Sequence, residues 1–198
     1  NWAVQFADAV MTRHDSLIHY NGNKPKYEYD LAFLGLSIDQ LGTIDKKYSE
    51  YMKAYIDYFV QADGTINGHK LSDYNIDRVR PGVNILELYE RTGDEKYKKA
   101  IEILVSQMET QPKTNSGGYW HKKIYPYQMW LDGIYMGSPF LARYAKDFNK
   151  PEWFDVVTFQ IEEIYKETKD EKTGLVYHAW DESREQRWCN PETGQSKH

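Results

Sequence analysis

The sequence carries a helical pattern that recurs at a spacing of about 50 residues, a period typical of stacked helical hairpins. Three short links, LGTIDKKY, TGDEKY and FNKPEW, each precede an amphipathic stretch and contain an Asp or Pro suited to a helix start. Each link ends in an aromatic residue, and these residues are Tyr48, Tyr97 and Trp153. They lie 49 and 56 residues apart (97 − 48 and 153 − 97). A chain with this period is expected to pair its helices one hairpin after another.

Apolar residues after each link recur at the i, i+3, i+4 and i+7 positions of an amphipathic helix. This pattern, with the signals at helix ends, predicts helices at 2–13, 29–41, 48–60, 82–92, 97–108, 154–165 and, in one or two pieces, within 127–147. Pro139 is expected to break or kink the last of these. No segment alternates as a long strand, so the fold class predicted is all-α.

The second helix of each pair is followed by a longer, glycine-bearing connection. Short links at one end and long connections at the other are typical of a solenoid or a closed α/α toroid. Six hairpins need about twelve helices of ~12 residues each, whereas the pattern predicts about seven. We therefore expect residues 1–198 to form one domain that is the front part of an (α/α)6 toroid, truncated on its C-terminal side.

Composition excludes several classes of function. A net charge of −5 argues against nucleic-acid binding, which requires clustered Lys and Arg. Charges interrupt every apolar run, so no membrane span is expected. The single cysteine, Cys189, excludes an internal disulfide and a thiolate metal site. The 17 Tyr and 6 Trp suit either a thick helical core or the binding of a sugar ring.

Motifs for other chemistries are missing from the sequence. It contains no H-E-x-x-H, no phosphate-binding G-x-x-x-x-G-K-[ST] and no G-x-S-x-G. We expect no metal and no cofactor. The cytoplasm is the compartment we favour, a periplasmic location stays open, and the oligomeric state is not predicted.

Three carboxylates follow the helical repeat. Glu28, Asp77 and Asp132 lie 49 and 55 residues apart (77 − 28 and 132 − 77), so they are expected at equivalent heights on the long-connection face. They would share a rim if the array closed. Each also has a purely structural interpretation. Glu28 could be a solvated acid of a first helical turn, Asp77 a helix-end residue, and Asp132 part of a buried ion pair.

Asp132 is the only acid in the aromatic stretch YPYQMWLDGIYMGSPF. We expect it on a helix that also carries Gln128, Met129, Tyr135 and Met136 on the same face. Burial among such side chains disfavours a charged carboxylate and suits a proton donor.

Two connections combine aromatic surfaces with hydrogen-bond donors, as sugar recognition requires. In GGYWHKKIYPY the donors His121, Lys122 and Lys123 follow Tyr119 and Trp120. In VYHAWDES the pair is His178 and Trp180. Loop histidines are more often structural and surface lysines more often solvated. The following run, DESREQRW, is mostly an exposed charge run, although Arg184 or Arg187 could hold an anion.

Longer stretches carry a family resemblance. The segments RPG, LELYERTGDEKY, GGYWHKKIYPYQMWLDGIYMGSPFLARYAK and YHAWDES, with QRWCNPETGQS, resemble the unsaturated rhamnogalacturonyl hydrolases, glycoside hydrolase family 105. The unsaturated glucuronyl hydrolases are more distantly similar. The resemblance runs from about residue 27 to the end and implies an (α/α)6 toroid whose later helices lie outside this sequence.

The resemblance implies an unusual reaction on products of pectin lyases. Such enzymes remove a 4,5-unsaturated galacturonic acid from the non-reducing end by hydrating its vinyl ether, and need one acid/base residue. The matching residues are Asp132 as the general acid/base and Asp77 as its partner. Substrate-binding positions are expected at His121, His178, Trp130, Met129 and Lys122.

Two departures and two alternatives accompany this hypothesis. Arg78 and Arg80 stand where the family often has neutral or acidic residues, and the family's next sugar-binding motif would follow His198. We therefore expect weak turnover by this chain. One alternative is a glucuronyl hydrolase acting on glycosaminoglycan-type disaccharides. The other is a non-catalytic helical-repeat binding module. The sequence does not decide which sugar follows the unsaturated one.

Overall fold

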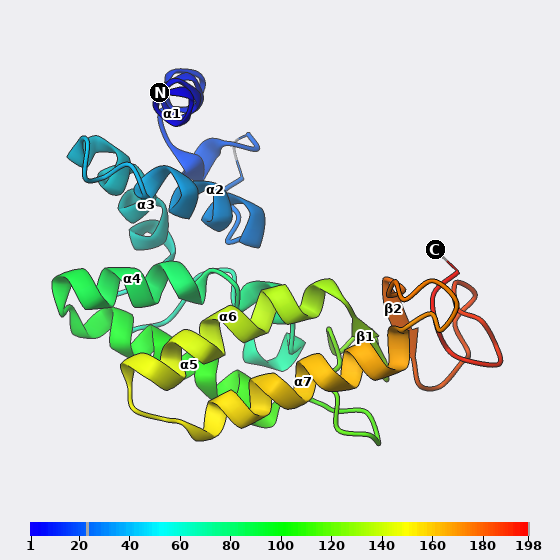
Figure 1. Cartoon of the computed structure of the whole chain (residues 1–198). Helices are drawn as coiled ribbons and strands as arrows, with labels where there is room; N and C mark the ends of the chain where they lie inside the picture. The colour runs from blue at the N-terminus through cyan, green and yellow to red at the C-terminus, as the bar shows by residue number, and fades with distance from the viewer. Residues whose placement is uncertain (23, 198) are drawn as a thin grey trace. The chain divides into compact units, whose positions relative to one another are not determined.

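The computed structural model describes residues 1–22 and 24–197, and over these ranges the chain is mainly helical (Figure 1). The α-helices are Trp2–Arg13 (α1), Tyr29–Asp39 (α2), Lys46–Phe59 (α3), Gly82–Thr92 (α4), Glu95–Thr110 (α5), Asp132–Asp147 (α6) and Glu152–Thr168 (α7). Short 3-10 turns occur at Leu17–His19 (η1), Leu71–Asp73 (η2) and Ile76–Arg78 (η3), and two strands at Gln128–Trp130 (β1) and Ala179–Asp181 (β2). The predicted all-α class with about seven helices is confirmed.

The chain divides into two compact units. The first contains residues 1–69 and 81–103, and the second contains residues 70–80 and 104–198. The helix α5 begins in the first unit and ends in the second. None of the described helices combines the length and the hydropathy that crossing a bilayer requires.

The first unit is built on the α2–α3 hairpin, whose two helices pack together. One face of α3 is buried throughout, as the spacing of its aromatic and aliphatic residues predicts. The buried Asn84 of α4 donates a hydrogen bond to the carbonyl oxygen of Ala32 in α2 at 2.8 Å. The hydroxyl of Tyr55 accepts a hydrogen bond from the backbone N–H of Glu28 at 3.0 Å, which fixes the start of α2.

The second unit is built on the α6–α7 hairpin and a small sheet. Helices α6 and α7 lie side by side (Figure 1). Strands β1 and β2 pair antiparallel, with Met129 opposite Trp180. Met129 and Trp180 form a buried cluster with Ile164 of α7. The sheet therefore anchors two long connections to the same helix.

The internal repeat is visible in the backbone. Asp45 and Asp94 accept hydrogen bonds from the backbone N–H two residues further on, and Pro151 precedes α7. The three aromatic residues that end the links are all buried. After each second helix the connection folds back through an isolated antiparallel bridge, and these bridges are Val60–Ile66, Lys113–Tyr119 and Lys169–Val176. The predicted hairpin repeat is confirmed in both parts of this pattern.

Two local predictions are wrong. Residues 128–130 form a strand instead of helix, so Gln128 and Met129 do not share a helical face with Asp132. The helix α6 also continues through Pro139, so of the predicted break or kink the break does not occur. A proline inside a helix costs about 3 kcal/mol. Burial of Phe140 and Leu141 immediately after it offsets that cost.

Candidate active site

Three predicted residues from separate segments of the second unit meet at one point. Asp77 lies in η3, His121 in the connection after α5, and Asp132 is the first residue of α6. One side-chain atom from each lies within 4.8 Å of the others. The repeat spacing of the two aspartates therefore predicted a real proximity, and the histidine lies between the same elements.

Backbone hydrogen bonds hold the first two residues in place. The side chain of Asn75 accepts from the N–H of Asp77 at 3.0 Å and so caps η3. The N–H of Ile76 donates to the carbonyl of His121 at 3.1 Å. The N–H of His121 donates to the carbonyl of Gln128 at 2.9 Å. These bonds link η3, the connection and β1 into one frame.

Asp77 is a paired carboxylate. Its Oδ1 lies 2.7 Å from Nε2 of His121, and its Oδ2 lies 2.6 Å from Nζ of Lys122. Burial raises the pKa of Asp77, but hydrogen bonds from His121 and Lys122 outweigh burial and hold this pKa below its usual value. Asp77 does not cap the helix that follows, because α4 has no side-chain cap.

Asp132 is in the opposite situation. Its Oδ1 is buried and has no hydrogen-bond partner within residues 1–22 and 24–197. The ammonium of Lys122 contacts Asp77 instead. The buried ion pair considered for Asp132 is therefore not found in the described part of the chain.

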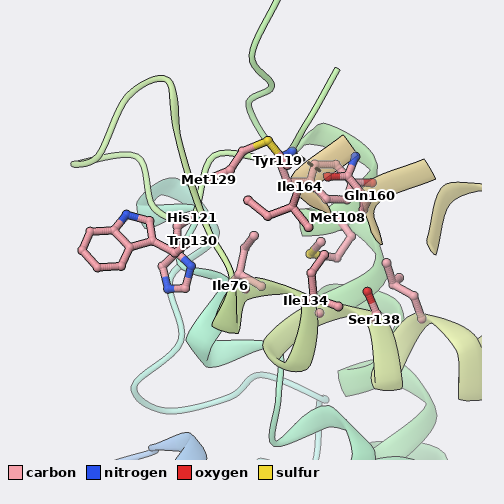
Figure 2. A pocket seen from close by; sticks show the side chains of 13 residues that line it. Ile76, Met108, Tyr119, His121, Met129, Trp130, Ile134, Ser138, Gln160 and Ile164 are labelled. Atoms are coloured by element: carbon pink, nitrogen blue, oxygen red, sulfur yellow. Dashed lines mark hydrogen bonds between the residues drawn. The ribbon is translucent and has the colours of Figure 1, made fainter. Parts of the chain in front are cut away.

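The far side of His121 faces a small cavity (Figure 2). Its Nδ1 atom is buried and has no hydrogen-bond partner among the described residues. A Cβ at Gly133 would lie 3.0 Å from Nδ1, so this glycine lets the ring approach α6. The cavity measures about 20 Å³, and Ile76, Ile134 and other mostly apolar side chains line it. It is large enough for a water molecule and far too small for a sugar.

Trp130 is the centre of an aromatic wall beside this trio. Its ring lies 6.2 Å from His121, 6.0 Å from Tyr125, 5.2 Å from His178 and 5.5 Å from Trp188, measured between ring centroids. His178 meets the indole edge-on and is exposed. The structure thus brings both predicted histidines and Trp130 together. Trp188 was missed, because it ends a charge run in which nothing marks it.

The remaining predicted residues occupy varied positions. Strand alternation turns Met129 away from Trp130 and into the buried cluster on α7, and Met129 also lines the small cavity beside His121. Glu28 belongs to the first compact unit, where its carboxylate lies 3.9 Å from Nζ of Lys26. Lys123, Arg184 and Arg187 are exposed, and Trp180 is buried.

Asp77, His121 and Asp132 together form a set of donor atoms of the kind that binds metal ions. Asp77, His121 and Asp132 each offer one ligand atom at suitable separations. However, both oxygens of Asp77 already accept hydrogen bonds, one of them from the ammonium of Lys122. A divalent cation would have to displace this like charge. The arrangement suits proton transfer better than metal ligation.

The second unit thus places two neighbouring acids beside an aromatic wall on a framework of helical hairpins. Residues 2–198 match Glycosyl Hydrolase Family 88, and the chain belongs to this family. A solved family 105 glycoside hydrolase from C. acetobutylicum ATCC 824 is 40% identical, with a TM-score of 0.92 over 100% of this chain and 54% of that chain.

Two further proteins are more distantly similar. Unsaturated rhamnogalacturonyl hydrolase YesR of Bacillus subtilis (strain 168) is 26% identical over 157 residues, which are 76% of this chain and 44% of YesR. A possible family 105 member from Klebsiella pneumoniae shares the fold, with a TM-score of 0.70 at 22% identity over 82% of this chain and 42% of that chain. The chain spans about half the length of these relatives.

Proposed function

We propose that this chain carries the catalytic acid of a hydrolase that removes 4,5-unsaturated galacturonic acid from the non-reducing end of rhamnogalacturonan lyase products. Family membership and the similarity to YesR support the class of substrate. The observation that carries the proposal is the contrast between two neighbouring acids. Asp77 is paired on both oxygens, whereas a buried oxygen of Asp132 has no partner within residues 1–22 and 24–197.

The proposed reaction adds water across the vinyl ether. The carboxyl group of Asp132 gives its proton to C4 of the unsaturated ring, and positive charge develops at C5 and the ring oxygen. Water then adds at C5 and returns a proton to the Asp132 carboxylate. The resulting hemiketal opens by breaking the bond from C5 to the ring oxygen. C1 is left as a hemiacetal, which collapses to an aldehyde and releases the remaining sugar.

The neighbours of Asp132 have supporting roles in this scheme. Asp77 is held ionised by His121 and Lys122, so its negative charge stabilises the positive charge that develops in the transition state. Lys122 is also placed to attract the carboxylate of the substrate. His178 and Trp130 form the side of the site against which a sugar ring can rest.

The test follows the ultraviolet absorbance of the conjugated double bond. We expect this absorbance to fall when the chain acts on an unsaturated disaccharide from rhamnogalacturonan, and to persist with Asp132→Asn. Enzyme in excess over substrate makes even slow turnover visible. Equal loss with both proteins would remove Asp132 from its role. No loss with the wild type would contradict the proposal.

The glucuronyl hydrolase alternative is decided by the same assay. It differs in the sugar that follows the unsaturated uronic acid, while the chemistry at C4 and C5 is shared. An unsaturated disaccharide from a glycosaminoglycan, compared at equal concentration, gives the ratio of kcat/KM values. A ratio above one for the rhamnogalacturonan product supports our proposal, and a ratio below one supports the alternative.

A further inference from the structure

A buried acid beyond the catalytic trio organises the connection after β2. Asp181, the last residue of this strand, is fully buried. Its Oδ1 accepts hydrogen bonds from the backbone N–H of Ser183 at 3.2 Å and from the hydroxyl of the same residue at 2.7 Å. Its Oδ2 accepts from the backbone N–H groups of Glu185 and Gln186 at 3.0 and 3.1 Å.

These four hydrogen bonds fix a loop whose other side chains are mainly exposed. Ser183, Arg184 and Glu185 are all exposed, so apolar burial does little to order this turn. Arg184 also adopts a left-handed conformation with φ of 60°, which a non-glycine residue adopts at a cost of about 1–3 kcal/mol. Hydrogen bonds to a charged acceptor are roughly twice as strong as neutral ones. The Asp181 carboxylate is therefore a strong constraint on residues 183–186, and the carbonyl of Trp188 accepts a further hydrogen bond from the N–H of Lys197 at 3.1 Å.

The loop presents an indole to the aromatic wall. Trp188 follows Gln186 by two residues, and its ring lies 5.5 Å from Trp130 at an interplanar angle of 54°. Both indoles are partly exposed. Trp130 in turn neighbours His121, which is hydrogen-bonded to Asp77. The rings of His121, Trp130 and Trp188 therefore form a series in which His121 is the ring next to Asp77 and Trp188 is the far end.

We propose that Asp181 is a positioning residue that holds Trp188 beside Trp130, and that Trp188 extends the wall to bind the sugar that is released. This inference rests on the proposed function. An indole face suits the apolar face of a pyranose ring. Since the reacting ring must lie against Asp132, a ring that contacts the far end of the series belongs to the leaving sugar.

The positioning part is tested without any substrate. Two indoles this close couple electronically and give an exciton band in the far-ultraviolet circular dichroism spectrum. We expect Trp188→Phe to abolish the band and Asp181→Asn to weaken it by at least about half, while the helical signal stays unchanged. Trp188→Phe keeps the hydrogen bonds of Asp181. Its spectrum therefore shows how much of the band comes from Trp188, even if Asp181→Asn destabilises the chain.

A matched control exists in the preceding turn. Asp170 accepts hydrogen bonds from the backbone N–H of Lys172 at 3.1 Å and the hydroxyl of Thr173 at 2.7 Å, much as Asp181 does, but its turn carries no tryptophan. Asp170→Asn should leave the exciton band unchanged. A full-strength band in Asp181→Asn, or equal losses in both variants, would overturn the positioning role.

The proposed contact between Trp188 and the released sugar is tested by changing the leaving group of the substrate. We compare an unsaturated disaccharide with the methyl glycoside of the same unsaturated uronic acid. Asp181→Asn and Trp188→Ala should raise KM about fivefold for the disaccharide, equal to about 1 kcal/mol, with kcat and the methyl glycoside kinetics changed less than about twofold. Equal effects on both substrates would overturn it. A wild type inactive on both would contradict the proposed function, whereas the exciton band still decides the role of Asp181.

Discussion

Oδ1 of Asp77 and Nε2 of His121 lie 2.7 Å apart although 44 residues separate them in the chain. The backbone bond from Ile76 to His121 closes the same pair of segments, so this contact is built into the fold of the second unit. Asp132 lies beside this fixed pair with a buried oxygen that nothing in the described residues satisfies. Among the described residues, the site thus combines one carboxyl group with a buried, unpartnered oxygen and one carboxylate whose two oxygens are both paired.

The pairing of Asp77 predicts a pH-dependent stability. A folded-state pKa below the unfolded value stabilises the protein above about pH 4, the ordinary value for an aspartate, and this stabilisation is lost as pH falls through the folded pKa. Asp77→Asn should therefore be less stable than wild type to urea at pH 7. The difference should shrink at about pH 3 and below. A difference that is independent of pH would show that the charge of Asp77 contributes nothing.

Asp132→Asn should separate activity from stability. Because the buried oxygen of Asp132 has no partner among the described residues, its replacement is expected to remove no hydrogen bond. We expect Tm to stay the same or to rise by up to about 4 °C, while turnover falls at least about 100-fold. Thermal unfolding and single-turnover assays measure the two quantities. A fall in Tm as large as that of Asp77→Asn would reveal a structural role for this carboxylate.

Gly133 gives a steric test of His121. In Gly133→Ala the new Cβ would lie 3.0 Å from Nδ1 of His121, so the ring must shift from Asp77. We expect kcat to fall about tenfold with little change in the helical signal. Gly137→Ala is the matched control on the same helix. Its Cβ meets side-chain atoms of Ile76 and Met108 at 3.3 and 3.5 Å, and these can adjust. Equal losses in both variants would contradict a specific effect on the histidine.

Cys189 should behave as an inert thiol in the folded protein. It is buried, and burial together with the nearby charge of Asp181 raises the pKa of this thiol. Alkylation by iodoacetamide at pH 8 should therefore be at least about 100-fold slower than in urea-unfolded protein. Asp181→Asn, which loosens the same loop, should react faster than wild type, and Asp170→Asn should not. Rapid alkylation of the wild type would show that the loop after β2 opens readily.

The helices and their order could be predicted because a long amphipathic segment repeats its apolar residues with the helical period over several turns. Strand β1 could not, since three residues are too few to show alternation. The proximity of Asp77 and Asp132 followed from the repeat, because equivalent positions in successive hairpins occupy equivalent heights. The opposite environments of these two acids did not follow from it. They depend on whether Lys122 contacts Asp77 or Asp132. The spacing of the repeat carries no information about that contact.

The roles of Trp188 and Asp181 could not be predicted from the sequence, because both residues belong to a run of charged residues. Such a run is typical of a solvent-exposed loop. Only the tertiary fold shows that Asp181 is buried and accepts hydrogen bonds along the loop, and that Trp188 meets a tryptophan 58 residues earlier (188 − 130).

The central claim is that the Asp132 carboxyl group delivers a proton to carbon, and the reaction in D₂O tests it most directly. We expect the uronic acid released by the wild type to carry one deuterium at C4 on a single face, as read by NMR. Asp132→Asn should release none at a comparable rate. Release of an intact 4,5-unsaturated uronic acid without deuterium would show direct cleavage of the glycosidic bond and would contradict the mechanism.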